Sequence, residues 1–155
     1  MSGVHVHPIE VRFGDCDPAG IVYFPRFFAL FHDAMETWFS ARLGLRYAEV
    51  VVGRKIGFPA VHTEADFKVP CALGDAIFVE LRVARLGRSA IDLVYAVRGA
   101  DGGLRLTGAT TCVVLDLDPA SPGFRKSLPI PGDLRARIER FMGEEEEPVP
   151  EDRPR

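Results

Sequence analysis

Two aspartates, Asp15 and Asp17, lie in the segment FGDCDPAGIVYFP at residues 13–25. Glycine and proline in this segment indicate a loop, and a strongly apolar helical pattern begins at Pro25. The N-terminus of a helix presents unpaired N–H groups and a partial positive charge, so a carbonyl group held there would be polarised. A carboxylate a few residues upstream could attack that carbonyl or activate water against it. The segment therefore suits acyl transfer.

The same aspartates also have simpler interpretations. Each could be a cap or turn residue, which is common for Asp before a helix. A D-x-D pair can bind a divalent cation, but no cluster of further ligands accompanies this one, so we expect no metal site. Cys16, between the aspartates, has no evident histidine partner in the sequence and is not expected to be a nucleophile. Spacing alone leaves the role of Asp17 open.

Composition excludes several classes of function. The 155 residues are 47% hydrophobic and 26% charged, which is typical of one packed domain. The formal charge of -3 offers no basic field for nucleic acid, and the apolar runs are too short to span a membrane. We expect no secretory signal, and three cysteines without a CxxC spacing favour a reducing cytoplasm. Because Asn and Gln are absent, an oxyanion hole must use backbone N–H groups or cationic or hydroxyl side chains.

The elements that must position the aspartates change type along the chain. Residues 4–13 alternate like a strand, and Pro8 makes this strand suitable for a sheet edge. Apolar residues spaced three and four apart predict a helix from Pro25 to Gly44 that is enclosed on several sides. Further strands are expected at residues 60–69, 76–86, 89–100 and 104–116, with a short stretch near 124–130 and an amphipathic helix at 134–142.

This order predicts a single α+β domain over residues 1–142. We expect an antiparallel five- to six-stranded sheet wrapped around one long central helix, with the four later strands forming a meander. Open sheet edges need a partner, so we expect a dimer with a continuous sheet, and two such dimers could associate. The acidic, Pro-rich residues 143–155 are expected to form a disordered tail.

The stretch FGDCDPAGIVYFPRFF resembles the signature of the 4-hydroxybenzoyl-CoA thioesterase family, which belongs to the hotdog-fold acyl-CoA thioesterases. The motif D-x-D-P-A-G-I-V, an aromatic residue and a proline precede the apolar helix, and the order of strands extends the likeness over roughly residues 5–130. The resemblance implies a hotdog fold, a homodimer that assembles to a homotetramer, and hydrolysis of an acyl-CoA thioester. It implies no cofactor and no metal, because coenzyme A is part of the substrate.

The resemblance also implies roles for individual residues. The catalytic carboxylate of the family falls on Asp17, and the backbone N–H that polarises the carbonyl falls on Phe24. Asp15 is then an organiser of the loop. Asp17 could form a mixed anhydride with the acyl group or activate water directly, and the sequence does not separate these two routes.

The family builds its acyl pocket from the long helix and the neighbouring subunit. Where the family meets a phenol hydroxyl with an acidic residue, this sequence has His32. Three interpretations are open. His32 binds the phenol hydroxyl, or the acyl group is a different aryl or alkyl acid, or His32 is a histidine of the core. Phe58 stands where a small polar residue could contact a ring hydroxyl, which weakens the 4-hydroxybenzoyl assignment. The further candidate pocket residues are Tyr23, Glu36 and His62.

Coenzyme A carries phosphates, so its site should contain cations. The candidates are Arg85, Arg88 and Ser89 at an expected hairpin, and Arg125 and Lys126 near the last strand stretch. An ordinary solvated turn is the alternative for each group.

Other functions stay open at this stage. The chain could hydrolyse short- or medium-chain aliphatic acyl-CoA or acyl-carrier-protein thioesters. It could bind acyl-CoA without catalysis, although a pure binder has no need for a carboxylate at the carbonyl. A dehydratase would use a paired histidine and acid, for which His62 and Glu64 are the candidates.

Overall fold

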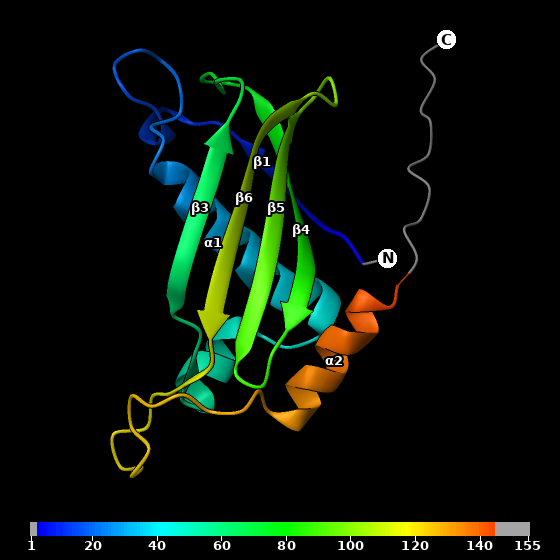
Figure 1. Cartoon of the computed structure of the whole chain (residues 1–155). Helices are drawn as coiled ribbons and strands as arrows, with labels where there is room; N and C mark the ends of the chain where they lie inside the picture. The colour runs from blue at the N-terminus through cyan, green and yellow to red at the C-terminus, as the bar shows by residue number, and fades with distance from the viewer. Residues whose placement is uncertain (1–2, 145–155) are drawn as a thin grey trace.

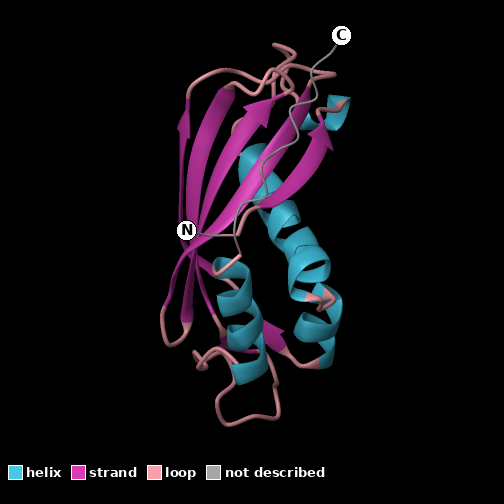
Figure 2. Ribbon diagram, turned by 90° about the vertical axis from the view of Figure 1, so that its right-hand side faces the viewer, coloured by secondary structure: helices cyan, strands magenta, loops and turns pink. Residues whose placement is uncertain are grey.

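The computed structural model describes residues 3–144, which form a five-stranded antiparallel sheet with two helices on one side (Figures 1 and 2). The sheet contains β1 (His5–Glu10), β3 (Ala60–Phe67), β4 (Ala76–Leu86), β5 (Ala90–Gly99) and β6 (Leu104–Val113). The helices are α1 (Arg26–Trp38) and α2 (Gly132–Met142), and short helical turns occur at η1 (Phe13–Asp15), η2 (Phe39–Leu43) and η3 (Glu49–Gly53). Two short strands, β2 (Ile56–Gly57) and β7 (Leu115–Asp116), pair separately. The expected α+β architecture is confirmed.

The order of strands in the sheet is β1-β4-β5-β6-β3. Strands β4, β5 and β6 form a meander, but β3 pairs with β6 at the far edge instead of with β4. The expectation of a four-strand meander was therefore wrong. The physical reason is that β1 already occupies the free side of β4, which leaves β3 only the open side of β6.

Helix α1 lies across the concave face of the sheet because its apolar residues recur on one side. Its buried residues are Phe27, Leu30, Phe31, Ala34, Met35 and Trp38. The helical path continues through η2, which has a wider π-helical turn, and ends at Gly44 in a left-handed conformation with φ of 67°. Pro25 stands just before the helix instead of at its first helical position.

Helix α1 packs closely on the sheet at Phe31. Its ring stacks on the Tyr95 ring of β5, with centroids 4.3 Å apart and planes 5° apart. Gly108 on β6 lies beneath this ring, and a Cβ atom at that position would come within 2.5 Å of Phe31 Cε2. Gly108 therefore allows the helix to approach the sheet this closely.

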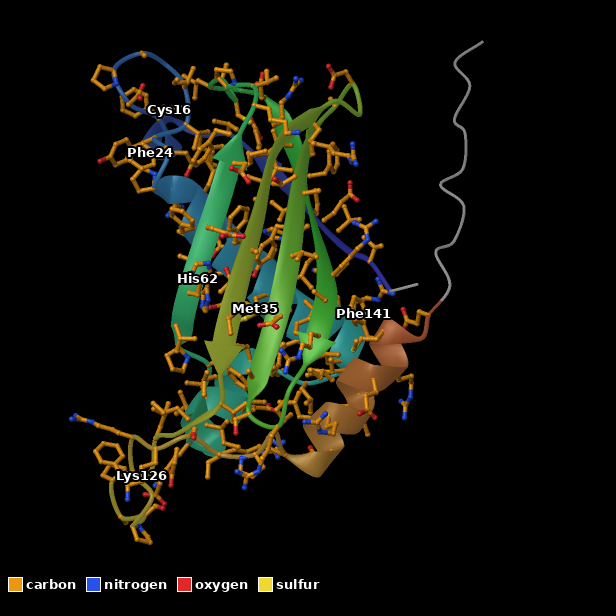
Figure 3. All side chains as sticks on the ribbon, in the orientation of Figure 1. Cys16, Phe24, Met35, His62, Lys126 and Phe141 are labelled. Carbon is orange, nitrogen blue, oxygen red and sulfur yellow. The ribbon has the colours of Figure 1, made fainter. Side chains whose placement is uncertain are left out.

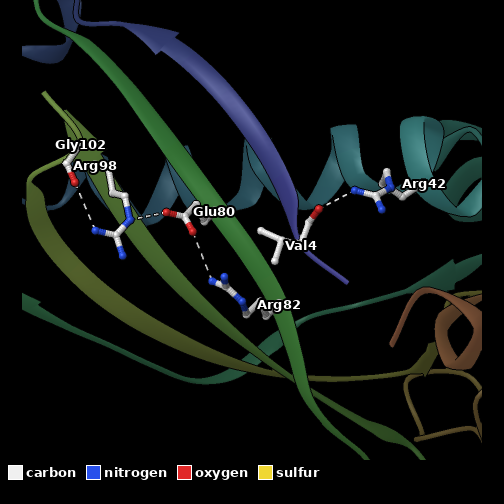
Figure 4. A network of polar contacts seen from close by, with 6 residues as sticks. All are labelled: Val4, Arg42, Glu80, Arg82, Arg98 and Gly102. Atoms are coloured by element: carbon white, nitrogen blue, oxygen red, sulfur yellow. Dashed lines mark hydrogen bonds and ion pairs between the residues drawn. The ribbon is translucent and has the colours of Figure 1, made fainter. Parts of the chain in front are cut away.

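Polar side chains cover the outer face of the sheet. The Glu80 carboxylate of β4 accepts hydrogen bonds from Arg82, at 3.3 Å, and from Arg98 of β5 (Figure 4). The same figure shows Arg42 of η2 donating to the Val4 carbonyl, which ties the start of the chain to the end of the long helix.

Several element boundaries differ from those expected. Strand β1 ends at Glu10, because Phe13 belongs to η1. The stretch at 124–130 forms no strand and makes only an isolated bridge between Ser127 and Leu115. Of the expected tail, only Gly143 and Glu144 fall among the described residues. No helix within residues 3–144 is long and apolar enough to cross a membrane.

Candidate active site

Asp17 lies in a tight turn that brings the two arms of its loop together. An isolated bridge pairs Cys16 with Val22, and the Asp17 N–H donates to the Ile21 carbonyl at 2.9 Å. The Asp17 Oδ1 atom accepts a hydrogen bond from the Ala19 N–H at 2.9 Å. No ion pair engages Asp17 in the part of the chain that the structure describes. The other carboxylate oxygen, Oδ2, is therefore available to a substrate.

Asp15 connects the base of this loop to helix α1. Its buried carboxylate accepts from Arg26 Nε at 2.8 Å and from the Arg12 N–H at 3.0 Å, and its carbonyl accepts from the Tyr23 N–H at 2.9 Å. Burial raises the pKa of Asp15, but the hydrogen bonds from Arg12 and Arg26 and the charge of Arg26 outweigh it and lower the pKa overall. Asp15 therefore stays ionised and holds the loop against the first turn of the helix.

The amide of Phe24 stands at the N-terminal end of α1. The carbonyls of Tyr23 and Phe24 accept from the N–H groups of Arg26 and Phe27, so the helical pattern has already begun there. Among residues 3–144 no acceptor is found for the Phe24 N–H itself. Figure 3 shows Phe24 beside Cys16 at the same end of the molecule. A free amide donor and a free carboxylate oxygen are thus held on one loop.

A cavity of about 290 Å³ lies between α1 and the β3 side of the sheet. Its walls are mainly aromatic and apolar, with a few hydroxyl, thiol and imidazole groups. The lining residues are Phe28, Phe31, His32, Met35, Phe58, Pro59, Ala60, Thr63, Tyr95, Thr110 and Cys112. Such a lining suits a flat apolar group that carries few polar atoms.

The predicted pocket residues separate into two groups. His32 and Phe58 line the cavity, and Glu36 lies one turn from His32, with 3.1 Å between Glu36 Oε1 and His32 Nε2. Tyr23 is exposed at the start of the helix and does not line the cavity. His62 does not line it either.

His62 faces the outer side of the sheet for a simple reason. Side chains alternate along a strand, and on β3 it is Thr63 that faces the cavity. His62 instead pairs with Glu64 on the outer face, with 3.2 Å between His62 Nε2 and Glu64 Oε2. Within one chain Thr63 lines the cavity and His62 does not, so a role for His62 in the acyl pocket stays a prediction.

The candidate CoA-binding residues lie at the opposite end of the sheet from the Asp17 loop. Arg85, Arg88 and Ser89 are at the β4–β5 turn, and Arg125 and Lys126 are in the loop that follows β7. Figure 3 shows Lys126 at the far end of the molecule from Cys16. One chain therefore does not bring these cations to Asp17.

Sequence reasoning missed four polar groups of the cavity and its mouth. Thr63, Tyr95 and Thr110 come from three different strands, so their meeting depends on the register of the sheet. Tyr47, in the helical turn that leads into η3, packs edge-on against His32 with ring centroids 5.6 Å apart. Burial and the nearby Glu36 carboxylate raise the pKa of Tyr47 to about 12, so its phenol is neutral.

Comparison with known proteins shows to which family this chain belongs. The model of the thioesterase-like superfamily matches residues 11–138. The chain belongs to this superfamily. By sequence it is 35% identical over 95 residues to a 1,4-dihydroxy-2-naphthoyl-CoA hydrolase of Prochlorococcus marinus (strain MIT 9303), an alignment that covers 57% of this chain and 62% of that protein. The chain thus spans somewhat less than two thirds of this relative.

Solved structures extend the likeness over nearly the whole chain. A 1,4-dihydroxy-2-naphthoyl-CoA thioesterase from Synechocystis has a TM-score of 0.77 and 27% identity, with 88% of this chain and 96% of that chain covered. A gentisyl-coenzyme A thioesterase has a TM-score of 0.74 and 27% identity, with 84% and 98% covered. These matches confirm the expected hotdog fold. They indicate the wider superfamily and do not single out the 4-hydroxybenzoyl-CoA thioesterases.

Proposed function

We propose that this superfamily member is an acyl-CoA thioesterase that acts on aromatic acyl groups. The observation that carries the proposal is the free Asp17 oxygen on the same loop as the unpaired Phe24 N–H. An aromatic cavity lies further along α1 in the same chain. The relatives named above are hydrolases of 1,4-dihydroxy-2-naphthoyl-CoA and gentisyl-CoA, which supports an aromatic acid as the acyl group.

In the proposed reaction, the thioester carbonyl oxygen accepts a hydrogen bond from the Phe24 N–H at the positive end of α1. The Asp17 carboxylate attacks the carbonyl carbon, and the negative charge that develops on the oxygen is stabilised by this amide. Collapse of the tetrahedral intermediate breaks the C–S bond and releases the CoA thiolate. Water then hydrolyses the mixed anhydride and regenerates Asp17. In the alternative route, Asp17 removes a proton from the water that attacks.

We also propose that the active unit is a dimer. Strand β3 is a sheet edge with a free side, and it carries the exposed apolar residues Val61 and Phe67. Antiparallel pairing of β3 with a second copy would place the start of one strand beside the end of the other. The cavity end of each chain would then lie beside the Asp17 end of its partner. Association of two dimers into a homotetramer stays a proposal that the family resemblance alone supports.

Such a dimer would also account for the distance between the cations and Asp17. The β4–β5 turn with Arg88 and the loop with Lys126 lie at the end of the sheet that antiparallel pairing turns toward the partner's Asp17 loop. These residues could then meet the phosphates of CoA. Coenzyme A is part of the substrate in this proposal, and no further cofactor is required.

The test is a kinetic screen of purified protein against aryl and alkyl CoA thioesters, followed through release of the free thiol. We expect kcat/KM to be at least tenfold higher for aryl esters than for alkyl esters of similar size, because the cavity is lined by aromatic rings. The Asp17→Asn variant is the control for contaminating hydrolases. A preference for alkyl esters would overturn the aromatic assignment but keep the thioesterase, whereas no turnover of any CoA ester would overturn both.

A further inference from the structure

The clasp, residues 71–75, is the segment just before β4 that contacts the loop carrying both proposed reacting groups. The Val22 N–H donates to the Cys71 carbonyl at 2.9 Å, and the Leu73 N–H donates to the Gly20 carbonyl at 3.0 Å. An isolated antiparallel bridge lies between these two bonds. The clasp and the second arm of the loop therefore form a short ladder.

The clasp also holds the first arm of the loop, where the chain has left β1. The Val11 N–H donates to the Asp75 carbonyl at 2.8 Å, and the Gly74 N–H donates to the Val11 carbonyl at 2.9 Å. Because Val11 is buried, water does not compete for these two bonds. One short segment, distant in the sequence from the loop, thus sets how far apart the two arms lie.

The Asp75 side chain closes the clasp. Its Oδ2 atom accepts a hydrogen bond from the Ala72 N–H at 2.8 Å, and the Asp75 N–H donates to the Ala72 carbonyl at 3.0 Å. The carboxylate thus reaches back to an N–H three residues earlier, as the acidic residue of a capping box does. The Asp15 carboxylate reaches back to the Arg12 N–H in the same way, at 3.0 Å. Two aspartates therefore close the two turns that bear the loop.

The backbone of the clasp depends on this carboxylate for its shape more than for its folding. Gly74 has a φ of 89°, and the freedom of glycine leaves the turn loose unless another bond restricts it. Ala72 is exposed, so water can replace the carboxylate at its N–H when the side chain is removed. Loss of the Asp75 carboxylate should therefore loosen the clasp without unfolding the domain.

Two further bonds connect the second arm of the loop to Asp17. The Gly20 N–H donates to the Asp17 carbonyl, and the Asp17 N–H donates to the Ile21 carbonyl, each at 2.9 Å. Val22, which the clasp holds, stands two residues before Phe24. A shift of this arm would change the distance between the Asp17 carboxylate and the Phe24 N–H. A misplacement of about 1 Å between reacting groups can cost roughly 10²-fold in rate.

We propose that Asp75 is a positioning residue of the thioesterase reaction. Its carboxylate closes the clasp and thereby sets the distance between the Asp17 carboxylate and the Phe24 N–H. Asp75 does not line the aromatic cavity, so it acts through the loop and not by contact with the acyl group. This inference deepens the proposed function and rests on it for the reaction whose geometry the clasp sets.

Steady-state kinetics with the best aryl-CoA ester of the screen test this role. Asp75→Ala should lower kcat about tenfold or more and change KM by less than about twofold, because the cavity that binds the acyl group is intact. Asp75→Asn keeps an oxygen that can accept from the Ala72 N–H, so it should recover most of kcat. A wild-type kcat in Asp75→Ala, or an equal loss in both variants, would overturn the inference.

Asp101→Ala is the matched control. Asp101 Oδ1 accepts the Gly103 N–H at 2.8 Å, so this carboxylate closes the turn between β5 and β6 at the same end of the sheet (Figure 1). Among residues 3–144, that turn makes no hydrogen bond to the loop that carries Asp17. The control should therefore keep the wild-type kcat and KM, and a loss equal to that of Asp75→Ala would overturn the inference.

Amide hydrogen exchange, followed by NMR, gives a second measurement that does not depend on turnover. In Asp75→Ala, the Val22 and Leu73 N–H groups should exchange about tenfold faster than in the wild-type protein, and in Asp75→Asn close to the wild-type rate. The Leu81 amide of β4, which is buried in the core, should keep its rate because only the clasp opens.

The two measurements separate this inference from the proposed function. Unchanged exchange of the Val22 and Leu73 N–H groups in Asp75→Ala would overturn the inference whether or not the protein hydrolyses a CoA ester. Faster exchange together with a wild-type kcat would overturn it as well, because the clasp would then not position the reacting groups. A wild-type protein that hydrolyses no CoA ester would overturn the proposed function, and with it any role of Asp75 in catalysis.

Discussion

Arg26 Nε donates to Asp15 Oδ1 at 2.8 Å, and this one contact joins the first turn of α1 to the base of the loop that carries Asp17. The loop also supplies the Phe24 amide, so both proposed reacting groups depend on the same joint. The contact is not needed for the rest of the core, because Arg26 is partly exposed. Its loss should therefore affect geometry at the site more than folding.

The first prediction follows from this contact. Arg26→Gln should lower kcat for an aryl-CoA ester about tenfold or more and change KM little, because ground-state binding depends mainly on the cavity. The free energy of unfolding, measured with urea, should fall by no more than about 1–2 kcal/mol. Arg26→Lys should recover part of kcat. Arg46→Gln, which breaks an exposed pair with Glu49, is the control and should behave like wild type.

The second prediction concerns Asp17. Asp17→Asn keeps an oxygen for the Ala19 N–H, so circular dichroism and the melting temperature should stay at wild-type values. Without a carboxylate, kcat should fall by about 10²–10⁴-fold or more. Wild-type turnover in this variant would rule out the proposed role. A single turnover in ¹⁸O water separates the two routes, since label in the Asp17 carboxylate indicates the anhydride.

Sequence patterns predicted where strands begin and end better than they predicted which strands pair. The bounds expected at 76–86 match β4, because Ile77, Val79, Leu81 and Val83 alternate cleanly with outward residues. Alternation tells which face a side chain occupies, but not which strand lies alongside. For that reason the pairing of β3 with β6 was missed.

At the candidate site, too, the local motif was predicted and the contacts between strands were not. The motif around Asp17 predicted a loop that leads into the N-terminus of a buried helix, and the structure has that loop. Thr63 and Thr110 were missed because threonine is an ordinary strand residue and gives no signal of its own. Only the register of three strands brings them together with Tyr95, and no local pattern encodes that register.

The third prediction tests pairing at the free edge of β3. Val61→Lys places a charge on this edge and should convert a dimer into monomers, as measured by size-exclusion chromatography with light scattering. Turnover should fall with the loss of the dimer. Val52→Lys is the matched control, because Val52 is equally apolar and exposed but lies in η3. A wild-type protein that is a stable monomer, or a Val61→Lys dimer with full activity, would contradict the proposed assembly.

The fourth prediction concerns pH and His5. His5, the first residue of β1, is buried, and its Nε2 atom lies 2.8 Å from the hydroxyl oxygen of Thr37 on α1. Burial, and then the charges of Arg42 and His7, lower its pKa from 6.5 to about 4. The unfolded chain therefore binds this proton more readily than the folded one. The contribution of neutral His5 to the free energy of unfolding is complete above about pH 6.5 and is lost as the pH falls toward 4.

Urea unfolding at several pH values measures this dependence. Between pH 6.5 and 4, protonation of His5 should lower the free energy of unfolding by about 3 kcal/mol at most. His7, Arg42 and Glu144 also face the site from β1, η2 and the end of α2, so the His5→Leu variant is needed to isolate the contribution. This variant should show a flatter dependence on pH. A histidine NMR titration provides a direct check, with a midpoint near 4 for His5, and a midpoint near 6.5 would contradict the prediction.

The fifth prediction concerns Gly108, whose missing side chain makes room for Phe31. A Cβ atom there would come within 2.5 Å of the Phe31 ring, so Gly108→Ala must push the ring away from Tyr95 or move β6. The free energy of unfolding should fall by about 1–3 kcal/mol, as for other overpacked cores. Gly53→Ala, with no atom within 4 Å of its added Cβ, should have little effect. Because the displaced Phe31 ring enters the cavity, Gly108→Ala should also raise KM for naphthoyl esters more than for benzoyl esters. Equal changes in KM would show that the stacked Phe31 and Tyr95 rings do not contact the acyl group.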